Sequence, residues 1–169
     1  SAARPMSKAE ILEVARRELS TEEFAKIRRL KRVIGSARLK TVVIVELVDG
    51  REVVMMLRRP RAAEQIEGNL RLGREFLREL GRRGLSSASA MFEAILDAVR
   101  AQLAEELKMT KEARSIRQAG RHYEALNRSM GPRLGGWRFE VPRVVDDFPA
   151  RDAILFMDLA PGTTFERLS

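Results

Sequence analysis

Apolar side chains in the first thirty residues recur at the spacing of α-helices. Ser7 and Ser20 are each followed three residues later by a glutamate, an arrangement typical of a capping box at a helix N-terminus. Behind each serine, apolar residues return every three or four positions. The pattern predicts two short helices, over about residues 8–19 and 21–31.

The spacing then changes from helical to strand-like. Residues 41–47 and 52–57 are rich in valine and isoleucine, which favour strands. Asp49 and Gly50 lie between the two segments, and Asp-Gly is a strong signal for a two-residue hairpin turn because glycine tolerates a positive φ. We therefore expect an antiparallel β-hairpin in this part of the chain.

The second half of the chain combines long helical stretches with two further strands. Helical spacing covers residues 62–80 and, after a loop that begins at Leu85, a longer stretch from about 89 to 127. Apolar alternation and a continuous apolar run predict strands at 137–141 and 153–159. This order favours an α+β fold, with a small antiparallel sheet, N-terminal helices and a long helix pair, over a doubly wound sheet.

The composition describes a helix-rich folded chain and excludes several kinds of site. A length of 169 residues suits one domain or one large lobe. The chain contains no cysteine, which rules out disulfides and thiolate metal sites within it. No apolar run approaches the roughly 18 residues of a membrane span, and no apolar core of a signal peptide is visible.

The net charge of +8 favours an anionic partner, such as phosphoryl groups, nucleic acid or an acidic membrane surface. The alternative is a solvated arginine-rich surface, because the basic residues are spread along the chain and mostly alternate with glutamate. Aromatic residues make up only 5% of the chain, whereas single-stranded nucleic acid usually needs exposed aromatic rings for stacking. Nucleic acid is therefore the less favoured partner.

Motifs for common catalytic chemistries are missing from the sequence. His122 is the single histidine, so a zinc site is disfavoured, and it fits a surface or packing residue of a helix. The nucleophile-elbow, Walker A and dinucleotide-binding patterns do not occur. A small hydrolase or metal enzyme therefore has no motif support.

Residues 33–60 resemble the start of the UbiB (AarF) family of atypical kinases. That family has a small-residue loop, a strand, an Asp-Gly-Arg hairpin, a Val-Ala-Val-Lys strand and then Arg-Pro. In this sequence the loop falls on Gly35, Ser36 and Ala37, and the position of the lysine is taken by Met56. By the resemblance, these four residues face a nucleotide.

The likeness continues through the rest of the chain. Residues 105–113 are similar to the family's acidic helix, and Glu112 takes the place of the glutamate that pairs with the strand lysine. Residues 154–162 are similar to the strand and hinge, which puts Asp158 and Leu159 beside the adenine. The resemblance thus implies a protein-kinase-like N-lobe.

That likeness also sets the expected domain limits. Residues 1–32 would form an N-terminal helical extension, and residues 33–169 the lobe, which would end at the hinge.

Departures from the family pattern bear on activity. The Lys-x-Gly-Gln motif does not occur, Thr41 replaces the loop glutamine, and the catalytic-loop and metal-binding motifs of the C-lobe would lie beyond Ser169. A neutral methionine at position 56 cannot orient phosphates as a lysine does. Methionine at this place also fits a strand residue that fills a core.

Loss of the strand lysine leaves Glu112 without its family partner. We expect it to pair instead with Lys40, Lys108 or Arg114.

The resemblance implies a divergent pseudokinase lobe with no catalytic residue of its own and no metal ligand. Its parent would act in isoprenoid-quinone or lipid homeostasis, in the cytoplasm or at the face of the inner membrane. ATP and Mg would be the family ligands, bound weakly or not at all by this chain. An anionic membrane surface, a protein partner or the missing C-lobe would be its partners. The alternative is a non-catalytic helical module that binds a protein or nucleic acid.

Overall fold

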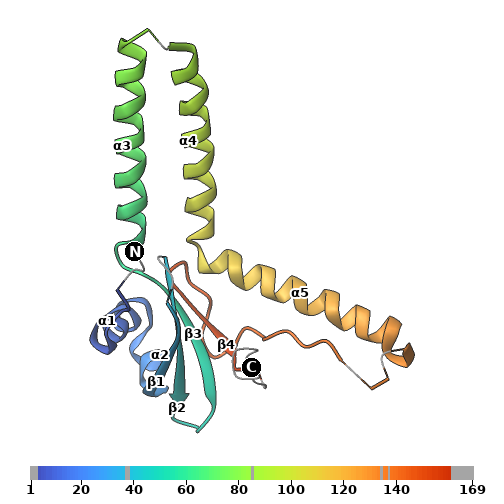
Figure 1. The fold of residues 1–169 in the computed structure, drawn as a ribbon. Helices are drawn as coiled ribbons and strands as arrows, with labels where there is room; N and C mark the ends of the chain where they lie inside the picture. Colours follow the sequence, from blue (N-terminus) through green and yellow to red (C-terminus); the bar gives the residue numbers. More distant parts are fainter. Residues whose placement is uncertain (1–3, 37–38, 85, 134, 137, 161–169) are drawn as a thin grey trace, which may run out of the picture.

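A four-stranded antiparallel sheet forms the centre of the molecule in the computed structural model (Figure 1). The structure describes residues 4–36, 39–84, 86–133, 135–136 and 138–160. Strands follow one another across the sheet in the order β1-β2-β3-β4. Their bounds are Ile27–Ser36 (β1), Lys40–Leu47 (β2), Glu52–Arg58 (β3) and Ile154–Asp158 (β4).

Helices surround this sheet unevenly. The short helices α1 and α2 lie beside the sheet, α3 and α4 form a hairpin that projects away from it, and α5 leads off at an angle (Figure 1). The bounds are Lys8–Glu18 (α1), Thr21–Ala25 (α2), Ala62–Arg82 (α3), Ser86–Glu106 (α4) and Met109–Met130 (α5), and a 3-10 turn at Gly131–Arg133 follows α5. The molecule is α+β, as the sequence predicts.

The hairpin between β2 and β3 is confirmed. Gly50 has a φ of +89°, which other residues rarely adopt. The side chain of Asp49 accepts a 3.0 Å hydrogen bond from the backbone N–H of Arg51 and so closes the turn. Local chemistry alone therefore fixes this part of the register.

The prediction of a helix over residues 21–31 is wrong beyond Ala25, because strand β1 begins at Ile27. The pairing of β1 with β2 has three irregularities, and each bulge adds one residue to the strand. Ile27 and Leu30 consequently contact the core although they are three positions apart. This spacing imitates a helix, so periodicity misleads here. The domain division at residue 32 stays a prediction.

Two further predictions are corrected. The long helix expected over residues 89–127 is two helices, because α4 begins at Ser86 and the chain turns after Glu106 before α5. Of the strand expected at 137–141, residues 138–141 form no ladder, and residue 137 lies outside the described residues. Asn127 of α5 holds this segment instead, since its amide bonds both the N–H and the carbonyl of Phe139. The last predicted strand is confirmed as β4.

Alternate residues of the strands face two different surroundings, because side chains along a strand point to opposite sides. One row pairs Val43 with Met55 and Met55 with Phe156, and all three belong to the main core with α1. We call this side the core face. The neighbouring row pairs Val42 with Met56 and Met56 with Leu155. We call that side the α5 face, since Leu155 and Met56 form a second, smaller cluster with residues of α5.

Candidate functional site

The α5 face carries Gly35 and Met56, two of the residues that the sequence places around a nucleotide. Gly35 pairs with Val42, so Gly35, Val42, Met56 and Leu155 form one row across all four strands. Ser36 is the last residue of β1 beside this row, and Ala37 lies outside the described residues. A side chain added at Gly35 would meet only Val42, at 3.6 Å. The edge of the face is therefore open at Gly35.

Met56 is half-buried at the middle of this row. Its thioether packs against a cluster formed by Met109, Ala113 and Leu155, which are fully buried. The structure thus shows an apolar patch at the position where the resemblance to the family predicts a lysine. A neutral side chain of this kind fills space and cannot hold a phosphate by charge.

Glu112 pairs with Lys40, one of the three partners that the sequence suggests. The Nζ atom of Lys40 lies 3.2 Å from Oε2 of Glu112. Lys40 begins β2 and Glu112 lies in the first turn of α5, so the pair joins sheet and helix across 72 positions of sequence. The Lys40 side chain keeps 27% of its surface exposed and Glu112 keeps 40%. The pair is therefore accessible from solvent.

Lys108, another suggested partner of Glu112, is engaged elsewhere. It donates a 2.5 Å hydrogen bond to Glu105, and this contact raises the pKa of Lys108 and lowers the pKa of Glu105. Both groups are solvent-accessible, so the pair adds little stability.

Asp158 and Leu159 lie at the opposite end of the sheet from Lys40, and Asp158 is in register with Val53 of the core face. Asp158 pairs with Val53 at one end of β3, whereas Lys40 pairs with Arg58 at the other. At about 3.4 Å per residue, the five steps along β3 span roughly 17 Å. The predicted hinge and the Lys40–Glu112 ion pair thus lie at opposite ends of the sheet.

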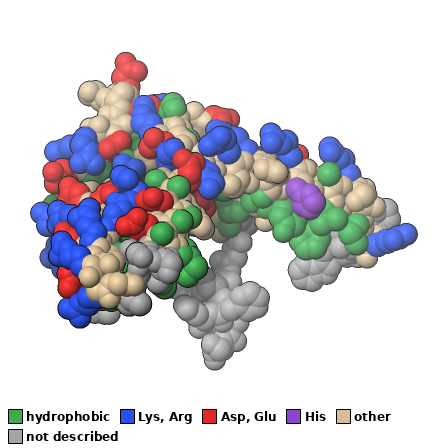
Figure 2. Space-filling model, turned by 90° about the horizontal axis from the view of Figure 1, so that it is seen from above, with side chains coloured by type: hydrophobic (Ala, Val, Ile, Leu, Met, Phe, Trp, Pro, Cys, Tyr) green, Lys and Arg blue, Asp and Glu red, His purple; other side chains and the backbone are tan. Residues whose placement is uncertain are grey.

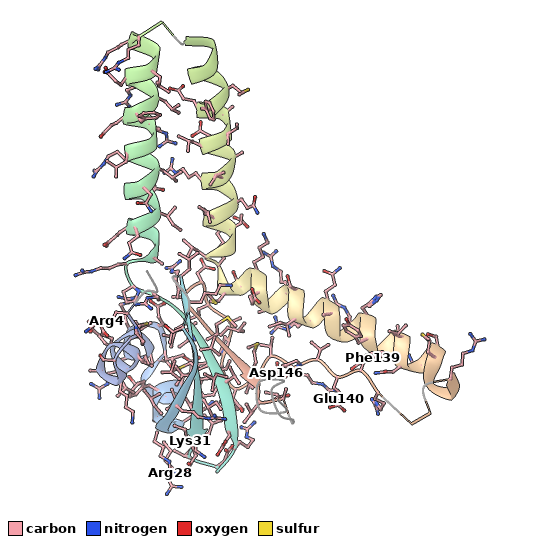
Figure 3. The ribbon with its side chains drawn as sticks, in the orientation of Figure 1. Arg4, Arg28, Lys31, Phe139, Glu140 and Asp146 are labelled. Atoms are coloured by element: carbon pink, nitrogen blue, oxygen red, sulfur yellow. The ribbon has the colours of Figure 1, made fainter. Side chains whose placement is uncertain are left out.

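A hollow of about 890 Å³ opens at the end marked by Asp158 and Leu159, which both line it. Its other walls come from α5, the tip of the β2–β3 hairpin and the extended segment 138–146, along which Figure 3 labels Phe139, Glu140 and Asp146. Among the described residues that line it are five arginines and five carboxylates, so the charges balance. Sequence patterns give no sign of this hollow, because distant segments create it.

The backbone at the predicted hinge is already paired in this structure. The N–H of Asp158 donates a 2.8 Å hydrogen bond to the carbonyl of Arg143, and Val144 forms an isolated bridge with Met157. The extended segment thus lies along β4 as a partial fifth strand. The amide of Asp158 would have to leave Arg143 to bind an adenine ring.

The described part of the site offers a cation, Lys40, and no cluster of metal-ligand side chains. Lys40 supplies a cation at the end of the face where the resemblance places the phosphates. Among the residues that the structure describes, no three or more His, Asp or Glu side chains gather in an arrangement that could hold a metal. The metal-binding acids of kinases belong to the other lobe.

A family model described as the ABC1 atypical kinase-like domain matches residues 1–169. The chain belongs to this family. The match confirms the resemblance to the UbiB (AarF) atypical kinases seen in the sequence, and the α+β arrangement agrees with a kinase-like N-lobe. A comparison with curated proteins finds no matching sequence.

Solved structures support the same fold. The chain is similar to Rv3197 of Mycobacterium tuberculosis, whose structure was solved as a complex with erythromycin, with a TM-score of 0.59 and 18% identity. The alignment covers 94% of this chain and 37% of Rv3197, so the chain spans little more than a third of that protein. At this identity the likeness shows the fold alone. Within the described part of the chain, no helix is both long and apolar enough to cross a membrane.

Proposed function

We propose that the chain forms the nucleotide-facing lobe of a divergent atypical kinase, a pseudokinase lobe that binds nucleotide weakly and transfers no phosphoryl group by itself. The observation that carries this proposal is Met56, which lies at the centre of the α5 face inside an apolar cluster. A kinase-like lobe needs a lysine there to orient the phosphates. From the resemblance to the UbiB (AarF) family, we also propose a role of the parent protein in quinone or lipid homeostasis.

Thermal denaturation with ATP or ADP and magnesium tests the proposal. We expect a small rise in Tm for the wild type and a larger one for Met56→Lys, because the new ammonium would face the phosphates and Glu112. Met56→Leu is the matched control, since it keeps an apolar side chain of similar volume. ATP hydrolysis should stay at background in the wild type. If no nucleotide shifts any variant, the kinase likeness is one of fold only.

A non-catalytic binding module is the second candidate, and the projecting α3–α4 hairpin favours it. Phe76 of α3 and Met91, Phe92 and Ile95 of α4 expose 64%, 59%, 46% and 47% of their surfaces. Large exposed apolar side chains that lie near one another are typical of interaction surfaces. Replacement of Phe76 and Phe92 by serine should abolish binding to a partner while the Tm shift with ATP stays unchanged.

The positive net charge of the chain is weaker support for a third candidate, an anionic surface as partner. Figure 2 shows Lys and Arg side chains over the visible face with Asp and Glu side chains among them, which agrees with a solvated basic surface. The arginines of α3 could still contact anionic lipid, at about 1 kcal/mol for each well-placed charge. Sedimentation with anionic vesicles at low salt tests this contact, and absence of binding would exclude it. A steep salt dependence of nucleic-acid affinity would instead favour a nucleic-acid partner.

A further inference from the structure

The lobe has lost one cation from β3 but holds another on the adjacent strand. Lys40 of β2 lies two residues from Val42, which is the direct partner of Met56. Side chains two apart on a strand share a face, so Lys40 points to the same side as Met56. Its contact with Glu112 of α5 confirms this orientation.

We propose that Lys40 is the phosphate-binding cation of this lobe, and that it takes over from β2 the task that a β3 lysine performs in kinase-like folds. The ligand class is the polyphosphate of a nucleoside di- or triphosphate. This inference rests on the proposed function, because it names the residue that holds a nucleotide on the α5 face. Glu112 is the positioning residue that directs the ammonium of Lys40.

The surroundings of Lys40 carry a surplus of positive charge. Arg58 lies directly opposite Lys40 in the β2–β3 ladder, so both cations lie on the α5 face. Like charges in such positions repel each other, and Glu112 balances only one of them. A phosphate bound between them would remove the repulsion. Two cations beside one carboxylate therefore suit an anionic ligand better than a closed ion pair.

The backbone before Lys40 is held in place. Arg59 donates its N–H to the carbonyl of Leu39 at 2.9 Å, and its guanidinium donates to Oγ of Ser36 at 3.3 Å. These bonds tie Ser36, at the end of β1, and Leu39, just before β2, to Arg59 at the end of β3. Lys40 thus starts from a fixed position although its side chain is partly exposed, and a fixed cation binds phosphate with less loss of conformational entropy.

A purely structural role for Lys40 predicts a different response to substitution. If the ion pair only joins α5 to the sheet, Lys40→Met lowers stability and leaves the affinity of the folded lobe for nucleotide unchanged. If Lys40 binds phosphate, the substitution weakens ATP affinity and changes stability little. The two roles are therefore separable by measuring ATP affinity and Tm on the same variants.

Equilibrium titration with ATP and magnesium on the full chain is the test. We expect Lys40→Met to weaken affinity by roughly tenfold to a hundredfold, the range for loss of a hydrogen bond to a charged group. Lys40→Arg should retain most of the affinity. Lys31→Met is the matched control, because Lys31 is another strand lysine in an ion pair, with Glu52, at the hairpin end of the sheet. This control should bind ATP as the wild type does.

A double variant that moves the positive charge from position 40 of β2 to position 56 of β3 completes the set of variants. Lys40→Met combined with Met56→Lys should regain affinity to within a few-fold of the wild type. Equal ATP affinity of wild type and Lys40→Met would overturn the role of Lys40 but leave a nucleotide-facing lobe in place. Binding by Met56→Lys alone, with none by the wild type, would also overturn it and would support Met56 as the site of the lost anchor. Binding by no variant would overturn both this inference and the proposed function.

Discussion

The two faces of one sheet differ in how completely they are closed. On the core face, Met55 and Phe156 lie within a large cluster, and Phe156 stacks on Phe148 with ring centroids 3.9 Å apart. On the α5 face, only three residues are fully buried in the cluster, and an exposed ion pair and a hollow lie at its two ends. The same strands thus build a stable core on one side and an accessible surface on the other.

Two adjacent methionines of β3, Met55 and Met56, therefore lie in different surroundings although they are chemically identical. Met55 is fully buried on the core face, whereas Met56 is half-buried on the α5 face. Because side chains alternate along a strand, one step in sequence moves a methionine from the closed core face to the more accessible α5 face. Substitutions of Met55 and of Met56 can therefore be compared to distinguish effects on stability from effects on binding.

The largest expected effect comes from truncating these two methionines. Met55→Ala should lower the free energy of unfolding by about 2–5 kcal/mol, because it leaves a cavity in a closed core. Met56→Ala should cost clearly less, since its neighbours and solvent can fill the space. Urea denaturation of both variants measures the difference. Equal losses would show that the α5 face is closed as tightly as the core face.

A smaller effect, a gain in stability, is expected at a buried hydroxyl on the core face that has no hydrogen-bond partner among the described residues. Thr41 is fully buried, and its hydroxyl has no hydrogen-bond partner among the described residues. Thr41→Val keeps the shape and removes the unpaired polar group, so it should raise the free energy of unfolding by about 1 kcal/mol. Urea denaturation again provides the measurement. A loss of stability would mean that the Thr41 hydroxyl makes a hydrogen bond that stabilises the fold.

An acid-sensitive contact lies at the rim of the core face. Glu23 of α2 accepts hydrogen bonds of 2.8 and 2.9 Å from Arg151, which precedes β4, and these bonds, with help from the Ser20 cap, lower the pKa of Glu23. A carboxyl with a lowered folded-state pKa stabilises the fold above its unfolded value near 4.5, and this contribution disappears as the pH falls through the folded value.

Glu23→Gln should therefore be less stable than the wild type at pH 6, and the gap should narrow as the pH falls through the lowered folded-state pKa of Glu23. Thermal denaturation at a series of pH values checks this, because glutamine retains the capping contact with Ser20 but not the charge. A gap that stays constant with pH would mean that the charge of Glu23 does not contribute.

Local signals in the sequence predict the parts of the fold that short segments determine. Asp49 and Gly50 fix the hairpin, the serine caps fix the starts of α1 and α2, and the apolar run at the end fixes β4. Strand β1 escapes prediction because its bulges give apolar residues a three-residue spacing. Its identity as a strand depends on pairing with β2, which no local pattern records.

The candidate site is predictable only in part, for a related reason. A resemblance to the family predicts that Met56, Glu112 and Asp158 lie near a nucleotide, but it offers Glu112 three partners. Selection of Lys40 depends on the register of β2 against β3 and on how α5 packs over them. The hollow beside Asp158 likewise needs segments that are distant in sequence. Contacts of this kind follow from the fold and not from the spacing of residues.

The smallest expected effect on stability comes from removing the ion pair of the α5 face. Lys40→Met should change the free energy of unfolding by less than about 1 kcal/mol, because exposed pairs gain little from attraction in water and lose side-chain entropy. Urea denaturation without nucleotide measures it, with Lys31→Met as the comparison. A loss of several kcal/mol would show that the pair holds α5 on the sheet and that this face, like the core face, is built for stability. A negligible loss would exclude a structural role for the pair, and the ATP affinity of the same variant then decides whether Lys40 binds phosphate.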